Sequence, residues 1–355
     1  MAADEIKQEI IAGISIGDLN GIGPEVIIKT FVDPAMMQIC VPVIYGSSKI
    51  ISFYRKALSL PEFNFSTIRN INEINNKKVN LLNVWDEDVK IEPGTASATA
   101  GKYALRSLEA ATHDLKEGKI HLLVTAPVDK HSVNIEMSGF TGHTGFLAQQ
   151  FNIPDPMMIL VSDLFRISFV SGHVPLKNVA SRISTEKIEK CLKVLDHSLK
   201  RDFGIRKPKI AVLGLNPHAG DNGLLGSEED EVIKPAVKKA FDKGIIVYGP
   251  YSADGFFGAA TWRKFDCVLA MYHDQGLIPF KALNFESGVN FTAGLPGIRT
   301  SPDHGTAYSL AGKNQASESS FRNAVYLGCT IFSNRRQYDM INASPLPVAS
   351  RGADR

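Results

Sequence analysis

Residues 95–124 read TASATAGKYALRSLEAATHDLKEGKIHLLV, in which an alanine-rich helical pattern from Thr95 to Lys116 leads into the apolar run Ile120–Val124. A helix followed by a short buried strand is the repeating unit of a parallel α/β sheet. The same alternation extends through the amino-terminal part of the chain. Its other apolar runs are Ile10–Ile16, Val41–Tyr45 and Val79–Val84. The sequence therefore predicts an α/β fold.

An antiparallel element interrupts this pattern. The apolar runs Met157–Val161 and Arg166–Val170 are separated only by residues 162–165, which predicts a hairpin. We expect a second lobe to begin near Asp129. Within this lobe a cap at Ser184 predicts the start of a helix, and a strand over Ile210–Leu215 follows it.

Two further helices are expected toward the carboxyl end. Ser227 precedes the acids Glu228, Glu229 and Asp230, and the helix dipole favours acids in a first turn. The last helix is predicted over residues 317–340. The polar tail after it, which contains Pro345 and Pro347, is expected to be disordered.

The composition is that of an ordinary globular protein. The chain of 355 residues is long enough for about two domains, and its 44% hydrophobic residues can fill their cores. The 39 basic and 37 acidic residues nearly cancel, which argues against a nucleic acid or an anionic membrane as partner. The polar amino terminus and the absence of an apolar stretch near the ~20 residues of a membrane span lead us to expect a cytoplasmic protein. The four cysteines form no Cys-x-x-Cys pair and are expected to be reduced.

Three histidines each follow an apolar run that is typical of a strand. They are His173, His218 and His273. Ligands of open α/β sheets bind at strand ends, and three imidazoles with an open coordination position are typical of a catalytic metal site. A metal-dependent active site is the first hypothesis. On position alone, ordinary hydrogen-bonded loop histidines are an equally strong alternative.

Neither common nucleotide fingerprint is present. The glycine spacing after Gly94 differs from that of a phosphate-binding P-loop, and Tyr103 stands where that loop has Ser or Thr. The glycines of residues 17–23 do not match the spacing of the dinucleotide-binding pattern either. These patterns alone therefore do not predict a nicotinamide cofactor.

Several motifs in a fixed order resemble one enzyme family. They are GDLNGIGPE at 17–25, GHT at 142–144, LNPHAG at 215–220, MYHDQG at 271–276 and DHGTA at 303–307. Together they resemble the 4-phosphohydroxy-L-threonine dehydrogenase family of pyridoxal phosphate biosynthesis. The resemblance implies the fold of isocitrate and isopropylmalate dehydrogenases, with two α/β domains and the active-site cleft between them. Residues 1–130 and 300–355 would form the first domain, on the cofactor side. Residues 131–299 would form the second, on the metal and dimerisation side.

The resemblance also implies the residues of the site. One divalent metal ion per subunit, zinc, magnesium or cobalt, would be bound by His173, His218 and His273. The cofactor, NAD or NADP, would contact Asp303, His304 and Gly305. The substrate would be bound by His143, Thr144, Lys281, Asn290 and Arg299. The planar fork of Arg, the compact charge of Lys and the neutral amide of Asn suit a phosphorylated amino acid.

Three residues are candidates for acid–base chemistry. Lys281 could relay a proton or stabilise negative charge, and Asp254 or Asp274 could be the general base or could orient other groups. Isolated acids such as these two are more often caps or surface residues. Two positions depart from the family pattern, because Leu19 stands where many relatives have Pro and Gly145 where an acid is frequent. Their effect on substrate choice stays open.

The implied reaction is oxidation of the 3-hydroxyl of 4-phosphohydroxy-L-threonine by NAD or NADP, followed by decarboxylation to 3-amino-2-oxopropyl phosphate. The implied assembly is a homodimer whose subunits share the active site. A D-threonate or D-erythronate 4-phosphate dehydrogenase is the alternative within the family. A three-histidine metallohydrolase and a non-catalytic metal-binding protein are alternatives from other classes, although the latter would not need Lys281, Asn290 and Arg299.

Overall fold

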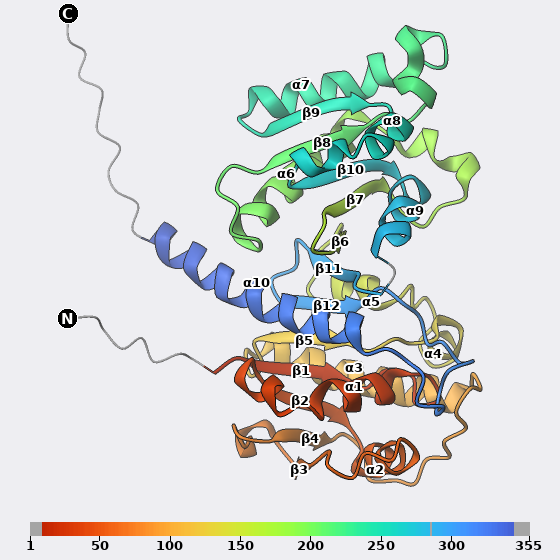
Figure 1. The fold of residues 1–355 in the computed structure, drawn as a ribbon, viewed down its shortest axis with the longest axis vertical. Coiled ribbons are helices and arrows are strands. Elements are labelled where there is room, and N and C mark those ends of the chain that lie inside the picture. Colours follow the sequence, from red (N-terminus) through yellow and green to blue (C-terminus); the bar gives the residue numbers. More distant parts are fainter. Residues whose placement is uncertain (1–8, 285, 344–355) are drawn as a thin grey trace, which may run out of the picture.

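The computed structural model describes residues 9–284 and 286–343. One mixed sheet of 12 strands runs through them in the order β3-β4-β2-β1-β5-β12-β11-β6-β7-β10-β8-β9, and Figure 1 shows it extending along the whole length of the molecule. The strands are β1 Ile11–Ser15, β2 Val41–Gly46, β3 Phe65–Ile68, β4 Val79–Asn83, β5 Leu122–Thr125, β6 Met157–Val161, β7 Arg166–Ser171, β8 Lys209–Leu213, β9 Ile246–Tyr251, β10 Cys267–Tyr272, β11 Val289–Ala293 and β12 Ile298–Pro302. The predicted α/β class is confirmed.

The helices cover both halves of this sheet. They are α1 Gly23–Phe31, α2 Ser48–Ala57, α3 Ala98–Lys116, α4 Lys130–Glu136, α5 His143–Gln150, α6 Thr185–Arg201, α7 Lys234–Asp242, α8 Ala253–Gly258, α9 His273–Asn284 and α10 Ser319–Ala343. The alanine-rich stretch forms α3, which starts where the Ser97 side chain accepts a hydrogen bond from the Ala100 amide. The longest helix, α10, crosses the middle of the sheet and packs on β12, β5 and β11 (Figure 1).

The amino-terminal half is a parallel sheet, as the alternating pattern predicts. The four apolar runs of this half are β1, β2, β4 and β5, and each pairs in parallel with its neighbours. The pattern did not predict the edge strand β3, whose four residues FSTI are mostly solvent-accessible. A short strand without a buried apolar run carries little periodic signal.

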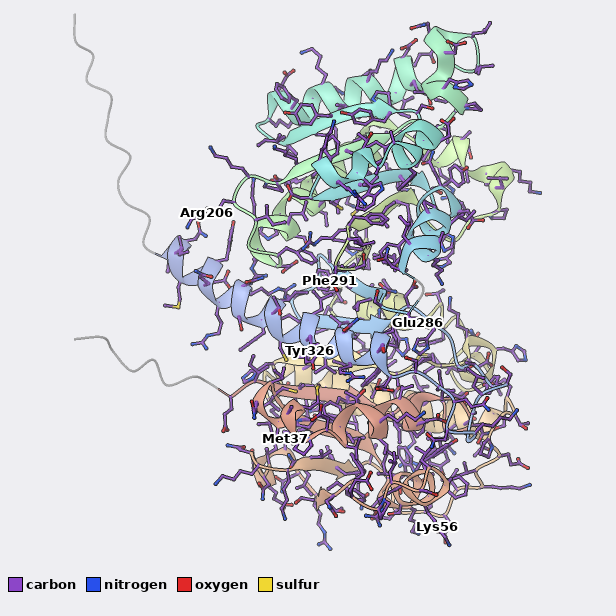
Figure 2. The ribbon with its side chains drawn as sticks, in the orientation of Figure 1. Met37, Lys56, Arg206, Glu286, Phe291 and Tyr326 are labelled. Carbon is purple, nitrogen blue, oxygen red and sulfur yellow. The ribbon has the colours of Figure 1, made fainter. Side chains whose placement is uncertain are left out.

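The predicted hairpin is β6 and β7, and β11 also runs antiparallel between β12 and β6. These strands join the two halves without a break in the sheet. Phe291 of β11 is completely buried and lies at the junction of the two halves (Figure 2). Because β12 pairs with both β5 and β11, the domain division at residues 130 and 300 stays a prediction.

Local signals set several of the helix ends. The Ser184 cap is confirmed, since its side chain accepts a hydrogen bond from the Lys187 amide at 3.2 Å. The acidic segment after Ser227 forms one π-helical turn, η6 over Glu229–Ile233, before α7 begins. The last helix begins at Ser319, close to its predicted start, and the tail with Pro345 and Pro347 lies outside the described residues.

The four cysteines form no disulfide among the described residues. Cys40, Cys267 and Cys329 are buried, Cys191 is partly buried, and all four are free thiols. Within the described parts of the chain, no helix is both long and apolar enough to cross a membrane.

Candidate active site

A cavity of about 1100 Å³ gathers residues from distant parts of the chain. Its wall includes the end of β5, parts of β6, β7, β11 and β12, the first turn of α5, one side of α6 and of α9, and the loop after β12. Most of the predicted site residues line it, namely His143, Thr144, His173, His273, Lys281, Asn290, Arg299, Asp303, His304 and Gly305. The predicted residues His218, Asp254 and Asp274 lie outside this wall.

Arg299 supplies a buried positive charge at the cavity. Its side chain is 3% exposed, and its guanidinium donates to Thr125 Oγ1 at 2.7 and 3.1 Å and to Thr292 Oγ1 at 3.3 Å. It forms no ion pair with an acid among the described residues. Burial lowers the pKa of Arg299 to about 9, so the group remains charged near neutral pH. A buried cation held only by hydroxyl groups is well suited to bind an anion.

His143 and Lys130 stand beside this charge. His143 begins α5, and its Nε2 atom is buried without a hydrogen-bond partner. Burial holds the pKa of His143 well below its usual value, and the charges of Arg299 and Lys130 lower it further. The imidazole is therefore neutral, with an unpartnered ring nitrogen in the site. Lys130 reaches toward Gly142 and also lines the cavity.

His173 and His273 lie next to each other, with ring centroids 5.2 Å apart. Partial burial lowers the pKa of His173, and the charges of Lys130 and His273 add to this effect. His273 Nδ1 lies 2.7 Å from Asp274 Oδ1. Because a carboxylate only accepts hydrogen bonds, Nδ1 donates in this contact, and Nε2 takes no part in it. Asp274 thus orients His273 from outside the cavity wall.

His218 is exposed on a different surface, in the segment η5 over Pro217–Gly223. Five consecutive residues of η5, from His218 to Asn222, have φ between 43° and 84°. Left-handed backbone costs about 1–2 kcal/mol per residue for most side chains, so this turn is strained. Among the described residues no cluster of three or more His, Cys, Asp or Glu could hold a metal ion. One chain therefore brings two of the three predicted metal ligands together and leaves the third apart.

Asp254 belongs with His218 and not with the cavity. It is exposed at the start of α8, which packs against η5. A hydrogen bond from Ser252 lowers the pKa of Asp254, and His218 contributes to the shift. Asp254 and His218 therefore lie on neighbouring segments outside the cavity wall.

The loop after β12 closes the other side of the cavity. Lys281 Nζ lies 3.6 Å from Asp303 Oδ2 and donates to the Asp303 carbonyl at 3.3 Å. Burial raises the pKa of Asp303, against the lowering effect of Lys281. Burial lowers the pKa of His304, whose Nε2 has no partner. Asn290 Oδ1 is also buried and has no hydrogen-bond partner among the described residues. Several polar atoms of the cavity are therefore free to bind a ligand.

The motif at residues 17–25 holds this loop in place. The Ile22 amide donates to the Thr306 carbonyl at 3.0 Å, and Tyr308 donates its hydroxyl hydrogen to Asp18 Oδ2 at 2.8 Å. A Cβ atom on Gly21 would lie 3.0 Å from the Thr306 oxygen, so glycine allows the close approach. The motif at 17–25 is therefore hydrogen-bonded to the loop that contains the motif at 303–307, nearly 300 residues later in the chain.

Lys130 and Thr125 were not predicted from the sequence. Thr125 ends β5 and is completely buried, so it resembles any strand residue in the sequence. Lys130 follows the Asp129 cap of α4, and the sequence shows no signal that separates it from other lysines. Only their position beside Arg299 and His143 reveals them.

The fold and the cavity define a class: an α/β protein with a cationic cavity lined by Lys130, Lys281 and Arg299. The family model described as "Pyridoxal phosphate biosynthetic protein PdxA" matches residues 38–328. The chain belongs to this PdxA family, which confirms the resemblance seen in its motifs.

Individual relatives agree with this membership. The chain is 48% identical over 341 residues to the 4-hydroxythreonine-4-phosphate dehydrogenase of Bacteroides thetaiotaomicron, covering 96% of this chain and 93% of the relative. It is 38% identical to an Oceanobacillus iheyensis protein with the provisional name D-threonate 4-phosphate dehydrogenase, covering 90% of this chain and 97% of that one. The crystal structure of the Klebsiella pneumoniae 4-hydroxythreonine-4-phosphate dehydrogenase matches with a TM-score of 0.80 and 35% identity, covering 91% and 98%.

Proposed function

We propose that the protein oxidises 4-phosphohydroxy-L-threonine (4-hydroxythreonine 4-phosphate) at its 3-hydroxyl with NAD or NADP. The resulting 3-keto acid then loses carbon dioxide to give 3-amino-2-oxopropyl phosphate. The observation that carries the proposal is Arg299, a buried cation that pairs with no acid in the described part of the chain and lies in a cavity also lined by Lys130 and Lys281. The substrate has two anionic ends that such a cavity can neutralise.

The residues of the cavity have distinct tasks in this proposal. Arg299 binds one anionic end through its planar fork, with Thr125 fixing its direction. The unpartnered Nε2 of His143 and Oδ1 of Asn290 make hydrogen bonds to the substrate. Lys281 lies nearer the reacting carbon and stabilises the negative charge that develops there.

The donor set at His173 and His273 fits a divalent metal ion. Both rings are adjacent, the lowered pKa of His173 keeps that ring neutral, and Asp274 leaves His273 Nε2 free to bind. His218 would supply the third ligand. A bound zinc, magnesium or cobalt ion would supply a Lewis acid that lowers the pKa of the substrate hydroxyl. In this proposal Asp254 or Lys281 takes the proton of the substrate hydroxyl, and Asp274 orients His273.

The proposed cofactor contacts are Asp303, His304 and Gly305. The loop that contains them is held rigidly by residues 17–25 and adjoins Lys281. The nicotinamide cofactor would supply the hydride acceptor. The loop itself would orient the cofactor and keep the buried His304 neutral.

A homodimer with shared sites is part of the proposal. His218 is exposed and does not line the cavity, whereas the other two proposed metal ligands, His173 and His273, do. Large apolar side chains are exposed near these segments, with Leu224 79%, Leu176 75% and Ile278 66% accessible. An exposed apolar surface of this kind favours association. A partner subunit would cover these side chains and bring its His218 to the cavity.

The test is a panel of phosphorylated hydroxy acids with NAD or NADP and a divalent metal, scored by NADH or NADPH formation and compared by kcat/KM. The highest kcat/KM with 4-phosphohydroxy-L-threonine is expected. A higher value with D-threonate or D-erythronate 4-phosphate would establish the alternative, with which the similarity to the Oceanobacillus protein is consistent. Hydrolysis without any change in cofactor absorbance would contradict both and favour a metallohydrolase.

A further inference from the structure

One buried carboxylate, that of Glu229, binds the backbone just before the strained segment η5. Glu229 is 1% exposed and belongs to the π-helical turn η6. Its Oε1 accepts hydrogen bonds from the backbone amides of Leu215 and Asn216, both at 2.7 Å. Its Oε2 accepts from Asn216 Nδ2 at 2.9 Å. These donors lie between the end of β8 and His218, so the carboxylate holds the base of the histidine's turn.

The charge of Glu229 is unusual for its position. It forms no ion pair with a Lys, Arg or His among the described residues, although a buried carboxylate normally requires a cation or several hydrogen-bond donors. Here the compensation comes only from amide groups that also fix the path of η5. The carboxylate and the turn therefore depend on each other.

Three glycines make room for this arrangement. A Cβ atom on Gly214 would lie 3.1 Å from Glu229 Oε1, and one on Gly220 would lie 2.7 Å from Oε2. A Cβ atom on Gly226 would lie 2.4 Å from Asn216 Nδ2. Gly220 and Gly226 also have positive φ, which glycine adopts without penalty. The backbone thus wraps closely around the carboxylate, which leaves η5 little freedom.

A second set of hydrogen bonds joins the residue after β8 to β10, the strand that precedes His273. Gln275 Oε1 accepts a hydrogen bond from the Met271 amide at 2.7 Å, and its Nε2 donates to the Gly214 carbonyl at 2.7 Å. Met271 lies in β10 just before His273, and Gly214 follows β8. The Gln275 side chain therefore fixes the ends of β8 and β10, the strands that precede His218 and His273, relative to each other.

We propose that Glu229 is a positioning residue for His218: its buried carboxylate holds η5 in the left-handed turn that presents the imidazole to the metal site of the partner subunit. This inference rests on the proposed function, in which His218 is a metal ligand. It adds a residue that touches neither substrate nor metal. A group of this kind changes metal affinity through the direction of the ligand.

The test is Glu229→Gln in the full-length, chelator-treated protein, titrated with Co²⁺ and followed by the visible absorption of the bound ion. The amide keeps the size of the side chain but places an NH₂ group against the Asn216 donor. We expect the Co²⁺ Kd to rise roughly 10- to 100-fold. Asn216→Ala, which removes only the side-chain donor, should also raise the Co²⁺ Kd. It replaces Glu229→Gln as the test if that variant does not fold.

The matched control is Asp202→Asn, another buried carboxyl-to-amide change, whose carboxylate hydrogen-bonds Ser198 and Arg335 and no described residue of η5. It should lower thermal stability and leave the Co²⁺ Kd within about twofold. Each variant is titrated at a concentration where sedimentation shows the same oligomeric state as the unmodified protein. An unchanged Kd in both Glu229→Gln and Asn216→Ala, with a raised Kd in His218→Ala, would overturn the positioning role alone. An unchanged Kd in His218→Ala would instead remove the proposed ligand, and the inference with it.

Discussion

Arg299 and His143 adjoin the same cavity, and burial affects the charge of each in a different way. Burial lowers the pKa of Arg299 only to about 9, so the guanidinium stays positive. For His143 the same cause, assisted by Arg299 and Lys130, favours the neutral ring. The site therefore combines a fixed cation with a neutral hydrogen-bonding imidazole. This combination suits a substrate that has both anionic groups and hydroxyls.

At the scale of single residues, Arg299→Ala tests the anion site. Losing a charge-assisted hydrogen bond in a desolvated pocket typically costs about 2–4 kcal/mol, or roughly 30- to 1,000-fold in kcat/KM. We expect the loss mainly as a higher KM in steady-state kinetics. Arg201→Ala is the control, because Arg201 pairs with Asp339 outside the cavity and should leave KM unchanged. A normal KM in Arg299→Ala would contradict the anion-binding role.

Lys281→Ala should have a different kinetic signature. If Lys281 stabilises charge that develops during the reaction, its loss lowers kcat more than it raises KM. Steady-state rates at saturating cofactor and metal measure this effect. An unchanged kcat would reduce Lys281 to a group that binds substrate and transition state equally.

The lowered pKa of His143 predicts a pH dependence of stability. Below the unfolded-state value of about 6.5, the unfolded chain binds a proton at this histidine while the folded protein does not. The free energy of unfolding therefore falls as the pH drops below about 6.5, by up to about 1.4 kcal/mol per pH unit for this group. Urea unfolding of the metal-free protein from pH 7 to pH 5 measures the slope. His143→Gln should reduce the slope and His131→Gln, at an exposed histidine, should not. Equal slopes in all three proteins would refute the assignment.

At the scale of elements, one buried ion pair fastens α6 to α10. Arg335 Nε donates to Asp202 Oδ1 at 2.6 Å, and its Nη1 donates to the Pro296 carbonyl at 2.7 Å. The side chains of this pair are 8% and 4% exposed. Since α10 also packs on β12, β5 and β11, the pair links α6 to the central strands. The position of Arg299 in β12 depends on this framework.

Arg335→Met should therefore be strongly destabilising. It leaves the Asp202 carboxylate buried without its cation, which typically costs about 3–5 kcal/mol. The matched control is Arg336→Met on the next, exposed position of α10, which should change the free energy of unfolding by less than about 0.5 kcal/mol. Urea denaturation midpoints compare the two variants, and similar midpoints would show that the buried pair contributes little.

At the scale of the whole molecule, the separation of His218 from His173 and His273 has the largest consequence. Glu229 holds the chain just before His218 through the amides of Leu215 and Asn216, so bringing His218 to the cavity of its own chain would disturb these hydrogen bonds. Completing the site through a second copy requires no such change. In the proposed dimer, the exposed side chains of Leu176, Leu224 and Ile278 would be covered by that contact.

Mixed dimers test this assembly. His218→Ala and His273→Ala chains should each be inactive alone, because each lacks one ligand. When the two are mixed and allowed to exchange subunits, the heterodimer has one intact site and one doubly defective site. Up to about a quarter of the unmodified activity is expected, since random pairing gives half heterodimers with one site each. Failure to recover activity despite proven subunit exchange would count against shared sites.

The sequence by itself determined the α/β class, the main strands and helix starts, and the family. Apolar periodicity and capping depend on only a few neighbouring residues, so they can be recognised in the sequence alone. Examples are the cap at Ser184 and the strands β1, β2, β4 and β5. Motif order gave the family and most of the residues that line the cavity.

Only the tertiary structure decided which groups meet and what charge they carry. Arg299 is fixed by Thr125, 174 residues away, and Gln275 joins strand ends 61 residues apart. The edge strand β3 and the cavity residue Lys130 gave no local signal of their place, and the local pattern marked Glu229 only as an acid in the first turn of a helix, not as a buried group. The isolation of His218 and the lowered pKa of His143 also depend on contacts between distant segments. Burial and proximity of charges arise from the packing of the whole chain, and no short window of sequence contains them.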